Sequence, residues 1–273
     1  MKLDRKLVIA DIGCRWGFSK RFTDAEGTFQ VFGFDPDSEE CKNLNDRYSH
    51  HAVSIVPIAL AGSNGRRTLY VTSEPACSSL LVPDPALTEN YPALNCARQV
   101  SSKEIDTVTL DDWVAENNVP VIDYIKIDTQ GTELEILQGS TATLQQVRCL
   151  EVEVEFNRIY LDQPLFADVD SFLRNQGFVL WKLTNQVHYS NHGKPDVPLG
   201  EDSVFYDDRQ RVQHPVFGGQ LYWANAHFVK ADVLSLTPKS ESQKLRDIIL
   251  FDSLGMPDVV DHLRQSSSVA TEL

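Results

Sequence analysis

The sequence lacks the features that mark membrane-spanning proteins and disulfide-bonded secreted proteins. No apolar run approaches the roughly 20 residues that a transmembrane helix needs. The apolar run at residues 7–10 follows a charged N-terminus and is too short for the core of a signal peptide. The 5 cysteines are odd in number and form no C-x-x-C pair, which argues against a disulfide framework or a zinc site. These absences predict a cytoplasmic protein with reduced thiols.

Clusters of basic residues are missing as well. The chain has 25 Lys and Arg against 39 Asp and Glu, which gives a formal net charge of −14. An acidic surface repels the phosphate backbone of nucleic acids and the anionic head groups of lipids. We therefore expect neither nucleic acid nor a membrane surface as a partner.

The first 185 residues alternate short apolar, β-rich runs with helical patterns. One helical stripe is formed by Cys41, Leu44 and Tyr48, which are spaced for one face of a helix. Alternating strands and helices predict an α/β fold, in which helices cover both faces of a mostly parallel, doubly wound sheet. The predicted strands cover residues 7–13, 30–35, 54–60, 121–128, 148–156 and 178–184, with a last one at 220–230.

Two long stretches interrupt the alternation, at residues 62–105 and 186–220. Apart from one strand expected near its start, the first is rich in Pro, Ser and Asn, and the second is rich in Asp, His, Gly and Pro. Long irregular loops in compact domains often act as lids, so we predict that both cap a substrate site. We expect one domain over residues 1–233 and a helical tail over 234–273. The apolar faces of the tail need burial on the domain or on a second subunit, which leaves a homodimer open.

A glycine loop follows the first predicted strand. It reads D-x-G-x-x-x-G from Asp11 to Gly17, which differs from the G-x-G-x-x-G loop that holds a dinucleotide pyrophosphate. S-adenosylmethionine carries no phosphate, and its amino-acid end needs a tight turn with free N–H groups and nearby acceptors. Gly13 and Gly17 suit the turn, Asp11 can act as an acceptor, and Cys14 belongs to the same predicted cofactor loop. A strand–helix turn without a ligand is the alternative interpretation.

A carboxylate stands at the end of the second predicted strand, in Phe34-Asp35-Pro36. Asp35 at this position can accept hydrogen bonds from both hydroxyl groups of an adenosine ribose. Pro36 fixes φ and suits the first turn of the next helix. We predict that both residues, with Ala59 at the end of the third strand, bind the cofactor. For Asp35, a helix N-cap is the alternative role.

The fourth predicted strand ends in Ile125-Lys126-Ile127-Asp128. Asp128 lies at the carboxyl end of a strand that we expect beside the glycine-loop strand, where ligands bind in open α/β sheets. Gly131 then permits a sharp turn into a helix. We predict that Asp128 belongs to the ligand site and helps to bind the cofactor, although it could instead cap that helix.

Together these motifs resemble the FkbM family of methyltransferases. The resemblance runs from about residue 7 to residue 230. It implies a class I Rossmann-like fold with a last antiparallel strand, S-adenosylmethionine as cofactor, and O-methylation of a sugar, a glycan precursor or a secondary metabolite. The matching segments are Asp11-Ile12-Gly13, Phe34-Asp35-Pro36, Ile125-Lys126-Ile127-Asp128 with Gly131 and Glu133, Glu153-Val154-Glu155-Phe156, Gln163-Pro164-Leu165-Phe166, Phe172-Leu173 with Gly177-Phe178, and Gln220-Leu221-Tyr222-Trp223.

A hydroxyl acceptor must lose its proton when it is methylated, so a general base would assist the reaction. Asp128 and His188 are the candidate catalytic residues. For His188, at the start of the second long stretch, a solvated loop histidine is the alternative. Ser79 lies where the family often has paired serines, and we expect it to contact the substrate.

Three glutamates alternate along the fifth predicted strand, at positions 151, 153 and 155. Alternation places them on one face of the sheet, so Glu153 and Glu155 are predicted to contact the hydroxyl groups of the acceptor. Carboxylates could also hold Mg²⁺, but no Asp-Asn pair accompanies them, and we expect no metal.

Two other functional classes remain open at this stage. A nucleotide-cofactor oxidoreductase is disfavoured because the third glycine and a Tyr-x-x-x-Lys pair are absent. A non-catalytic binding protein with a methyltransferase fold is kept open by Arg15 in the glycine loop. Preferential binding of adenosylhomocysteine or of NAD would separate these classes.

Overall fold

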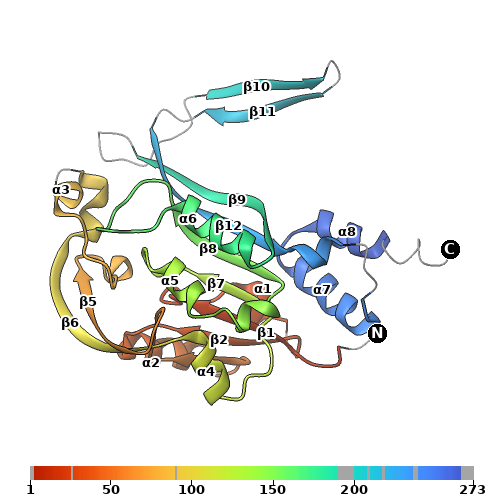
Figure 1. Ribbon diagram of the computed structural model, residues 1–273, viewed down its shortest axis with the longest axis horizontal. Coiled ribbons are helices and arrows are strands. Elements are labelled where there is room, and N and C mark those ends of the chain that lie inside the picture. The colour runs from red at the N-terminus through yellow and green to blue at the C-terminus, as the bar shows by residue number, and fades with distance from the viewer. Residues whose placement is uncertain are drawn as a thin grey trace.

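The computed structural model describes residues 3–25, 27–89, 91–189, 200–207, 210–216, 219–235 and 239–265 (Figure 1). Its centre is a seven-stranded sheet with the order β3-β2-β1-β7-β8-β12-β9. The order reverses direction at β1, which places a ligand crevice beyond the carboxyl ends of β1 and β7. The strands are β1 (Leu7–Ile12), β2 (Phe29–Phe34), β3 (Val53–Val56), β7 (Tyr124–Ile127), β8 (Cys149–Glu155), β9 (Phe178–Tyr189) and β12 (Gln220–Lys230).

Strand directions agree with the predicted class. β1, β2, β3, β7 and β8 pair in parallel, and β12 is antiparallel to both of its neighbours, β8 and β9. This confirms the predicted α/β fold with a mostly parallel, doubly wound sheet and a last antiparallel strand.

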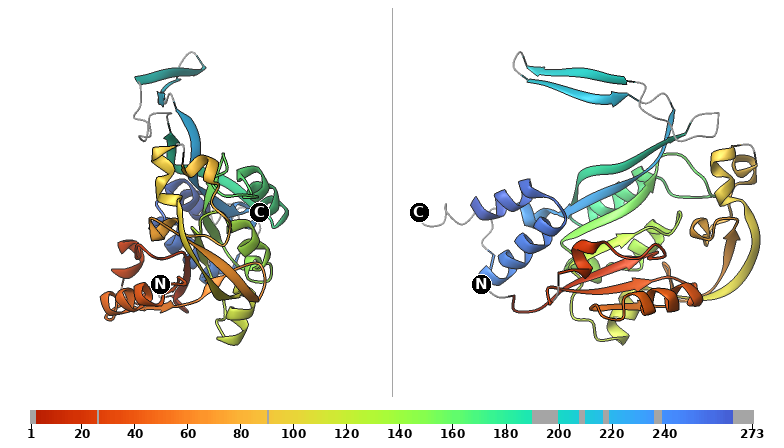
Figure 2. Two further views of the ribbon diagram at one scale, coloured as in Figure 1. Left: turned by 90° about the vertical axis from the view of Figure 1, so that its left-hand side faces the viewer. Right: turned by 180° about the vertical axis from the view of Figure 1, so that it is seen from behind.

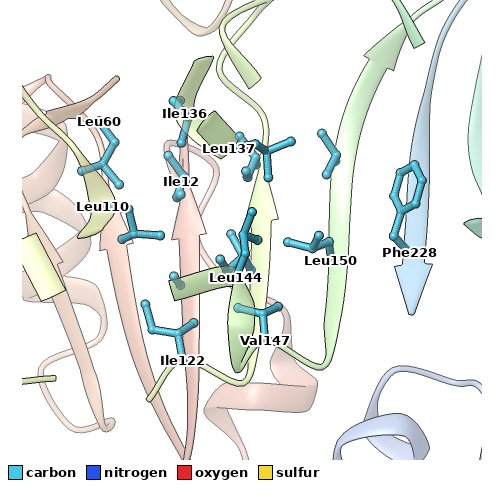
Figure 3. Packing of buried hydrophobic residues seen from close by; sticks show 14 of the residues in the cluster. Ile12, Leu60, Leu110, Ile122, Ile136, Leu137, Leu144, Val147, Leu150 and Phe228 are labelled. Carbon is cyan, nitrogen blue, oxygen red and sulfur yellow. The ribbon is translucent and has the colours of Figure 1, made fainter. Parts of the chain in front are cut away.

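Two apolar layers hold the helices against the sheet. Strand residues of alternating register face opposite layers, as the two-residue period of a strand requires. Figure 3 shows residues of the larger layer, among them Ile12 of β1, Leu137 of α5 and Leu150 of β8. The helices beside the sheet are α1 (Lys20–Thr23), α2 (Ser38–Arg47), α4 (Leu110–Glu116), α5 (Glu133–Gln138) and α6 (Phe166–Asn175), with the 3-10 turn η3 (Thr143–Gln145).

The segment after β3 forms a second sheet. The strand that we predicted at residues 67–72 is present, whereas the irregular loop predicted for the rest of 62–105 contains a second long strand at its end. β5 (Gly65–Thr72) and β6 (Gln99–Val108) pair antiparallel, and β4 (Ala59–Leu60) completes three strands in the order β4-β6-β5. The single strand predicted at 54–60 is therefore two strands in two sheets, with Pro57 between them. Figures 1 and 2 place β5 and β6 at one end of the seven-stranded sheet. The connection from β5 to β6 contains η1 (Pro75–Cys77), α3 (Pro85–Thr88) and η2 (Pro92–Ala97), and we call β4, β5, β6 and these turns the cap.

The second long stretch, 186–220, also differs from the prediction. β9 continues to Tyr189, so His188 lies in a strand, where it pairs with Leu221 of β12. β10 (Gly200–Asp207) and β11 (Gln210–Val216) form a separate two-stranded sheet. The part of the prediction that concerns residues 190–199 lies outside the described residues.

The C-terminal helices pack on their own domain. η4 (Ala231–Leu234) leads into α7 (Glu241–Ser253) and α8 (Pro257–Gln265), which lie side by side in Figure 2. Leu250, Phe251 and Val259 are fully buried in the second apolar layer together with Leu7 and Val229 of the sheet. Within the described residues no helix is long and apolar enough to cross a membrane.

Candidate functional site

A cavity of about 520 Å³ opens where the carboxyl ends of the central strands face the cap. Its size is in the range typical of sites for cofactors and small substrates. The structure brings most of the predicted site residues together in it. Those that line the cavity are Gly13, Pro36, Asp35, Ala59, Ser79, Asp128, Glu153 and Glu155.

Four predicted site residues do not line this cavity. Asp11 is buried one layer below it, and the thiol of Cys14 is buried in the second apolar layer. Gly17 lies against the ring of Tyr48. His188 lies in β9 outside the lining, so the geometry leaves Asp128 as the candidate base that reaches the cavity.

The glycine loop is locked to the ends of its two neighbouring strands. Gly13 has φ +82°, and a Cβ atom added to it would stand 1.9 Å from the carbonyl oxygen of Asp128. The backbone N–H groups of Gly13 and Cys14 both donate to the carbonyl oxygen of Phe34, at 2.9 and 3.2 Å. Only glycine permits both the backbone conformation and this approach, so the loop fixes the spacing between β1, β2 and β7.

Gly13→Ala should disrupt this junction. We expect a loss of about 2–4 kcal/mol in the free energy of unfolding, because backbone strain adds to overpacking against a carbonyl group. Gly27→Ala is the matched control, since Gly27 has φ +78° and no atom within 4 Å of the added Cβ. Urea unfolding of both variants separates the clash from the cost of positive φ. Equal destabilisation of the two variants would contradict the interpretation.

Asp35 is buried at the end of β2 and lines the cavity. Its Oδ1 accepts a hydrogen bond of 2.8 Å from the backbone N–H of Asp37. Burial raises the pKa of Asp35 above its usual range, and Arg15 opposes that rise. Arg15 itself donates to Asp37 at 3.1 Å. The arginine of the glycine loop, which left a non-catalytic binding protein open, therefore has an ion-pair partner next to the site.

Lys126 supports Asp128 from inside the sheet. Its Nζ lies 3.6 Å from Oδ1 of Asp11 and 3.6 Å from Oδ2 of Asp128. Burial raises the pKa of Asp11 to about 6, while Lys126 opposes that rise. Although burial works against it, the carboxylates of Asp11 and Asp128 raise the pKa of Lys126. Asp11 and the cavity-lining Asp128 thus share one lysine as their partner.

Gln130 connects the site to the cap. It has φ +61°, and its Nε2 donates to Oδ1 of Asp128 at 3.0 Å and to Oε2 of Glu153 at 2.7 Å. Its Oε1 accepts from the hydroxyl of Tyr160 at 3.2 Å, and its backbone carbonyl accepts from Ser79 at 2.7 Å. Ser79 therefore holds the cap against the β7–α5 turn and lines the cavity at the same time.

Glu133 stabilises the same turn from below. Its Oε1 accepts from the backbone N–H groups of Thr129 and Gly131, at 2.7 and 3.1 Å. Burial raises the pKa of Glu133 to about 7, against the effect of these hydrogen bonds.

Glu153 and Glu155 are buried side chains on the cavity side of β8. Burial and the nearby carboxylates of Asp128 and Glu133 raise the pKa of both well above the usual range. The site is thus acidic, with Lys126 as the cation closest to Asp128 among the residues that the structure describes. In that same part of the chain, no group of three or more His, Cys, Asp and Glu has the arrangement of a metal site.

Comparison with known families decides the class of protein. Residues 10–180 match the methyltransferase FkbM domain. The chain belongs to the FkbM methyltransferase family. Membership of a methyltransferase family argues against the nucleotide-cofactor oxidoreductase that the sequence analysis had left as an alternative.

Two characterised relatives belong to the same kind of enzyme. The 2-O-methyltransferase NoeI of Sinorhizobium fredii is 28% identical over 173 residues, which cover 60% of this chain and 70% of NoeI. The hexuronic acid methyltransferase AglP of Haloferax volcanii is 24% identical over 165 residues, which cover 57% of this chain and 62% of AglP.

Solved structures of methyltransferases are similar over most of the chain. A methyltransferase FkbM from Methylobacillus flagellatus has a TM-score of 0.45 at 14% identity. The aligned region covers 82% of this chain and 43% of that protein. Magnesium protoporphyrin IX methyltransferase from Synechocystis was solved with bound S-adenosylmethionine. It has a TM-score of 0.39 at 12% identity, and the aligned region covers 83% of this chain and 71% of that protein.

Lys126, Gln130 and Tyr160 are site residues that we did not predict from the sequence. A signal for Lys126 exists, since a lysine inside the otherwise apolar Tyr124–Ile127 strand needs a buried partner. Gln130 and Tyr160 gave no such signal, because their roles depend on contacts with β8 and the cap.

Proposed function

We propose that this methyltransferase uses S-adenosylmethionine and methylates a hydroxyl group of a sugar, a glycan precursor or a secondary metabolite. The observation that carries the proposal is the convergence of Gly13, Asp35 and Asp128 from three adjacent strand ends on one cavity. The named activities of NoeI and AglP support an oxygen acceptor on a sugar. We also propose a small molecule or a glycan, rather than nucleic acid, as the partner, since the chain carries a net charge of −14.

The residues present fit this cofactor. Asp35 offers carboxylate oxygens for a ribose diol, and Ala59 offers an apolar wall beside it. The Gly13 turn lies directly against the backbone of Asp128, so the glycine loop and Asp128 adjoin each other in the cavity lining. A cationic ligand would favour the ionised forms of Glu153 and Glu155, whose pKa values are raised without it, and would be attracted by them.

S-adenosylmethionine supplies an activated methyl group for in-line displacement. The protein must align the acceptor, exclude water and accept one proton. Asp128 is positioned to take the proton of the acceptor hydroxyl, while Lys126 and Gln130 hold its two oxygens. Residues of β5, β6 and η1 in the cap line the same cavity, and Ser79 bonds the segment after η1 to the β7–α5 turn.

Asp35→Ala should weaken cofactor binding. Losing charged hydrogen bonds to a ribose should cost about 1.5–3 kcal/mol, or roughly 10- to 150-fold in the dissociation constant of adenosylhomocysteine. Calorimetry measures the effect, with Asp46→Ala on the exposed side of α2 as the control. Unchanged affinity in a folded Asp35→Ala protein would rule out this cofactor site.

Methyl transfer should not depend on added metal. Dialysis against EDTA should leave the rate of methyl transfer unchanged, because alignment and a protein base suffice for displacement at a sulfonium. Loss of activity that Mg²⁺ restores would instead assign metal binding to the face of Glu153 and Glu155.

A further inference from the structure

The cavity has a wall that the proposed cofactor residues do not use. It is formed by side chains of β9 and β12, and we call Asn185, Tyr189, Trp223 and Asn225 the β9–β12 wall. In the pairing of β12 with β8, Trp223 stands opposite Glu155 and Asn225 stands opposite Glu153. Residues opposite each other in an antiparallel pair share one face, so an aromatic ring and an amide lie next to the two buried glutamates.

A bulge turns Asn185 toward this wall. Asn225 pairs with Thr184 of β9 and Trp223 pairs with Val187, so β9 carries one extra residue at this point. Asn185 adopts φ +52° there and lines the cavity. Bulges beside active sites re-aim side chains, and a non-glycine residue at positive φ is retained where its surroundings hold it.

The aromatic part of the wall is held in place by its neighbours. Burial raises the pKa of Tyr189, and the neighbouring Trp223 side chain opposes that rise, so the two side chains lie next to each other. The ring of Tyr189 also packs edge-on against Tyr222, with 5.1 Å between ring centroids. Asn225 is fixed by a hydrogen bond of 2.8 Å from its Nδ2 to Oε1 of Glu151, which leaves its amide oxygen for a ligand, and Asn185 is exposed. An aromatic surface beside these amides suits an amphipathic ring whose C–H face packs on the indole and whose hydroxyl groups meet the amides.

Cations are absent from this side of the described cavity lining. The two lining residues that carry positive charge are Arg15, from the glycine loop, and Lys103, from β6 of the cap. The lining residues of β8, β9 and β12 are carboxyl, amide and aromatic side chains. Lys126 does not line the cavity and is already paired with Asp11 and Asp128. A carboxylate, sulfate or phosphate on the acceptor would therefore lose its hydration there without gaining a cationic partner from the lining.

We propose that the acceptor is a neutral, hydroxyl-bearing sugar ring that packs on Trp223 and bonds to Asn185 and Asn225, and that this wall rejects acidic sugars. The inference rests on the proposed sugar O-methylation and narrows its substrate class. It separates this chain from a relative named for hexuronic acid.

The test compares three pairs of sugars that differ only at C6. Methyl glycosides of glucose, galactose and mannose are titrated against their uronates by saturation-transfer NMR, with the protein saturated by adenosylhomocysteine. At least one neutral glycoside should bind, and its uronate should bind about tenfold more weakly or worse, because it buries an unpaired charge. Trp223→Ala should abolish glycoside binding, and Trp223→Phe, which keeps an aromatic face, should restore most of it.

The outcomes separate the two proposals. Adenosylhomocysteine affinity should stay the same in both Trp223 variants, which also shows that they fold. If adenosylhomocysteine does not bind the unaltered protein, the proposed function fails. If it binds but the uronates bind as well as the neutral glycosides, or no glycoside binds, the neutral-acceptor inference is wrong while the methyltransferase site stands.

Discussion

Asp128→Asn is expected to lower turnover by about 10²- to 10⁴-fold, the range typical of removing a general base. Asparagine keeps the shape of the side chain and can still accept a hydrogen bond from Gln130, which lies 3.0 Å away. It cannot take a proton from a hydroxyl group. Because the geometry is preserved, the dissociation constant of adenosylhomocysteine should change much less than kcat.

His188→Ala is the comparison for this experiment. His188 does not line the cavity, so its removal should change turnover far less than Asp128→Asn. Both variants are measured in single-turnover methyl transfer to the glycoside that binds best. If both substitutions leave turnover intact, neither residue is the base. If His188→Ala has the larger effect, the assignment of the base to Asp128 is wrong.

Arg148→Met is expected to lower the free energy of unfolding by about 3–5 kcal/mol, since it leaves a buried carboxylate without its main partner. Arg148 precedes β8 and forms a bidentate pair with Asp247 of α7, with both N–O distances at 3.0 Å. Asp247 is fully buried. Arg148 also donates to Asp232 of η4 at 2.9 Å, so one guanidinium joins the sheet to η4 and α7. Urea unfolding measures the loss.

Two further variants distinguish a lost ion pair from lost packing. The double variant Arg148→Met with Asp247→Leu removes both charges and should recover most of the stability. Arg174→Met breaks the exposed pair of Arg174 with Asp170 and should have little effect, since surface pairs contribute little. A double variant as unstable as Arg148→Met alone would show that the charge of Asp247 is not the cause.

The predicted elements that the structure confirms are those with a strong local signal. β1 and β2 are mainly apolar runs that are largely buried, and β8 alternates apolar residues with glutamates; the ends of all three strands agree with the prediction within a few residues. β6 was missed because it is mostly exposed and polar, so its sequence shows no apolar period. Its strand conformation depends on hydrogen bonds to β5, which are remote in sequence.

Local sequence determined the parts of the site whose chemistry is contained in one segment. The D-x-G turn requires glycine by its own backbone, and Asp35 and Asp128 follow strands whose carboxyl ends meet at one edge of a parallel sheet. Tertiary structure alone decided which of the candidates share the cavity. The register of β12 against β9 left His188 outside the cavity lining and turned Asn185 into it, and the burial of Lys126 between two carboxylates made it a partner of Asp128. These outcomes depend on strand register and on distances between side chains that are far apart in sequence, and neither quantity is encoded in the spacing of residues along a single segment.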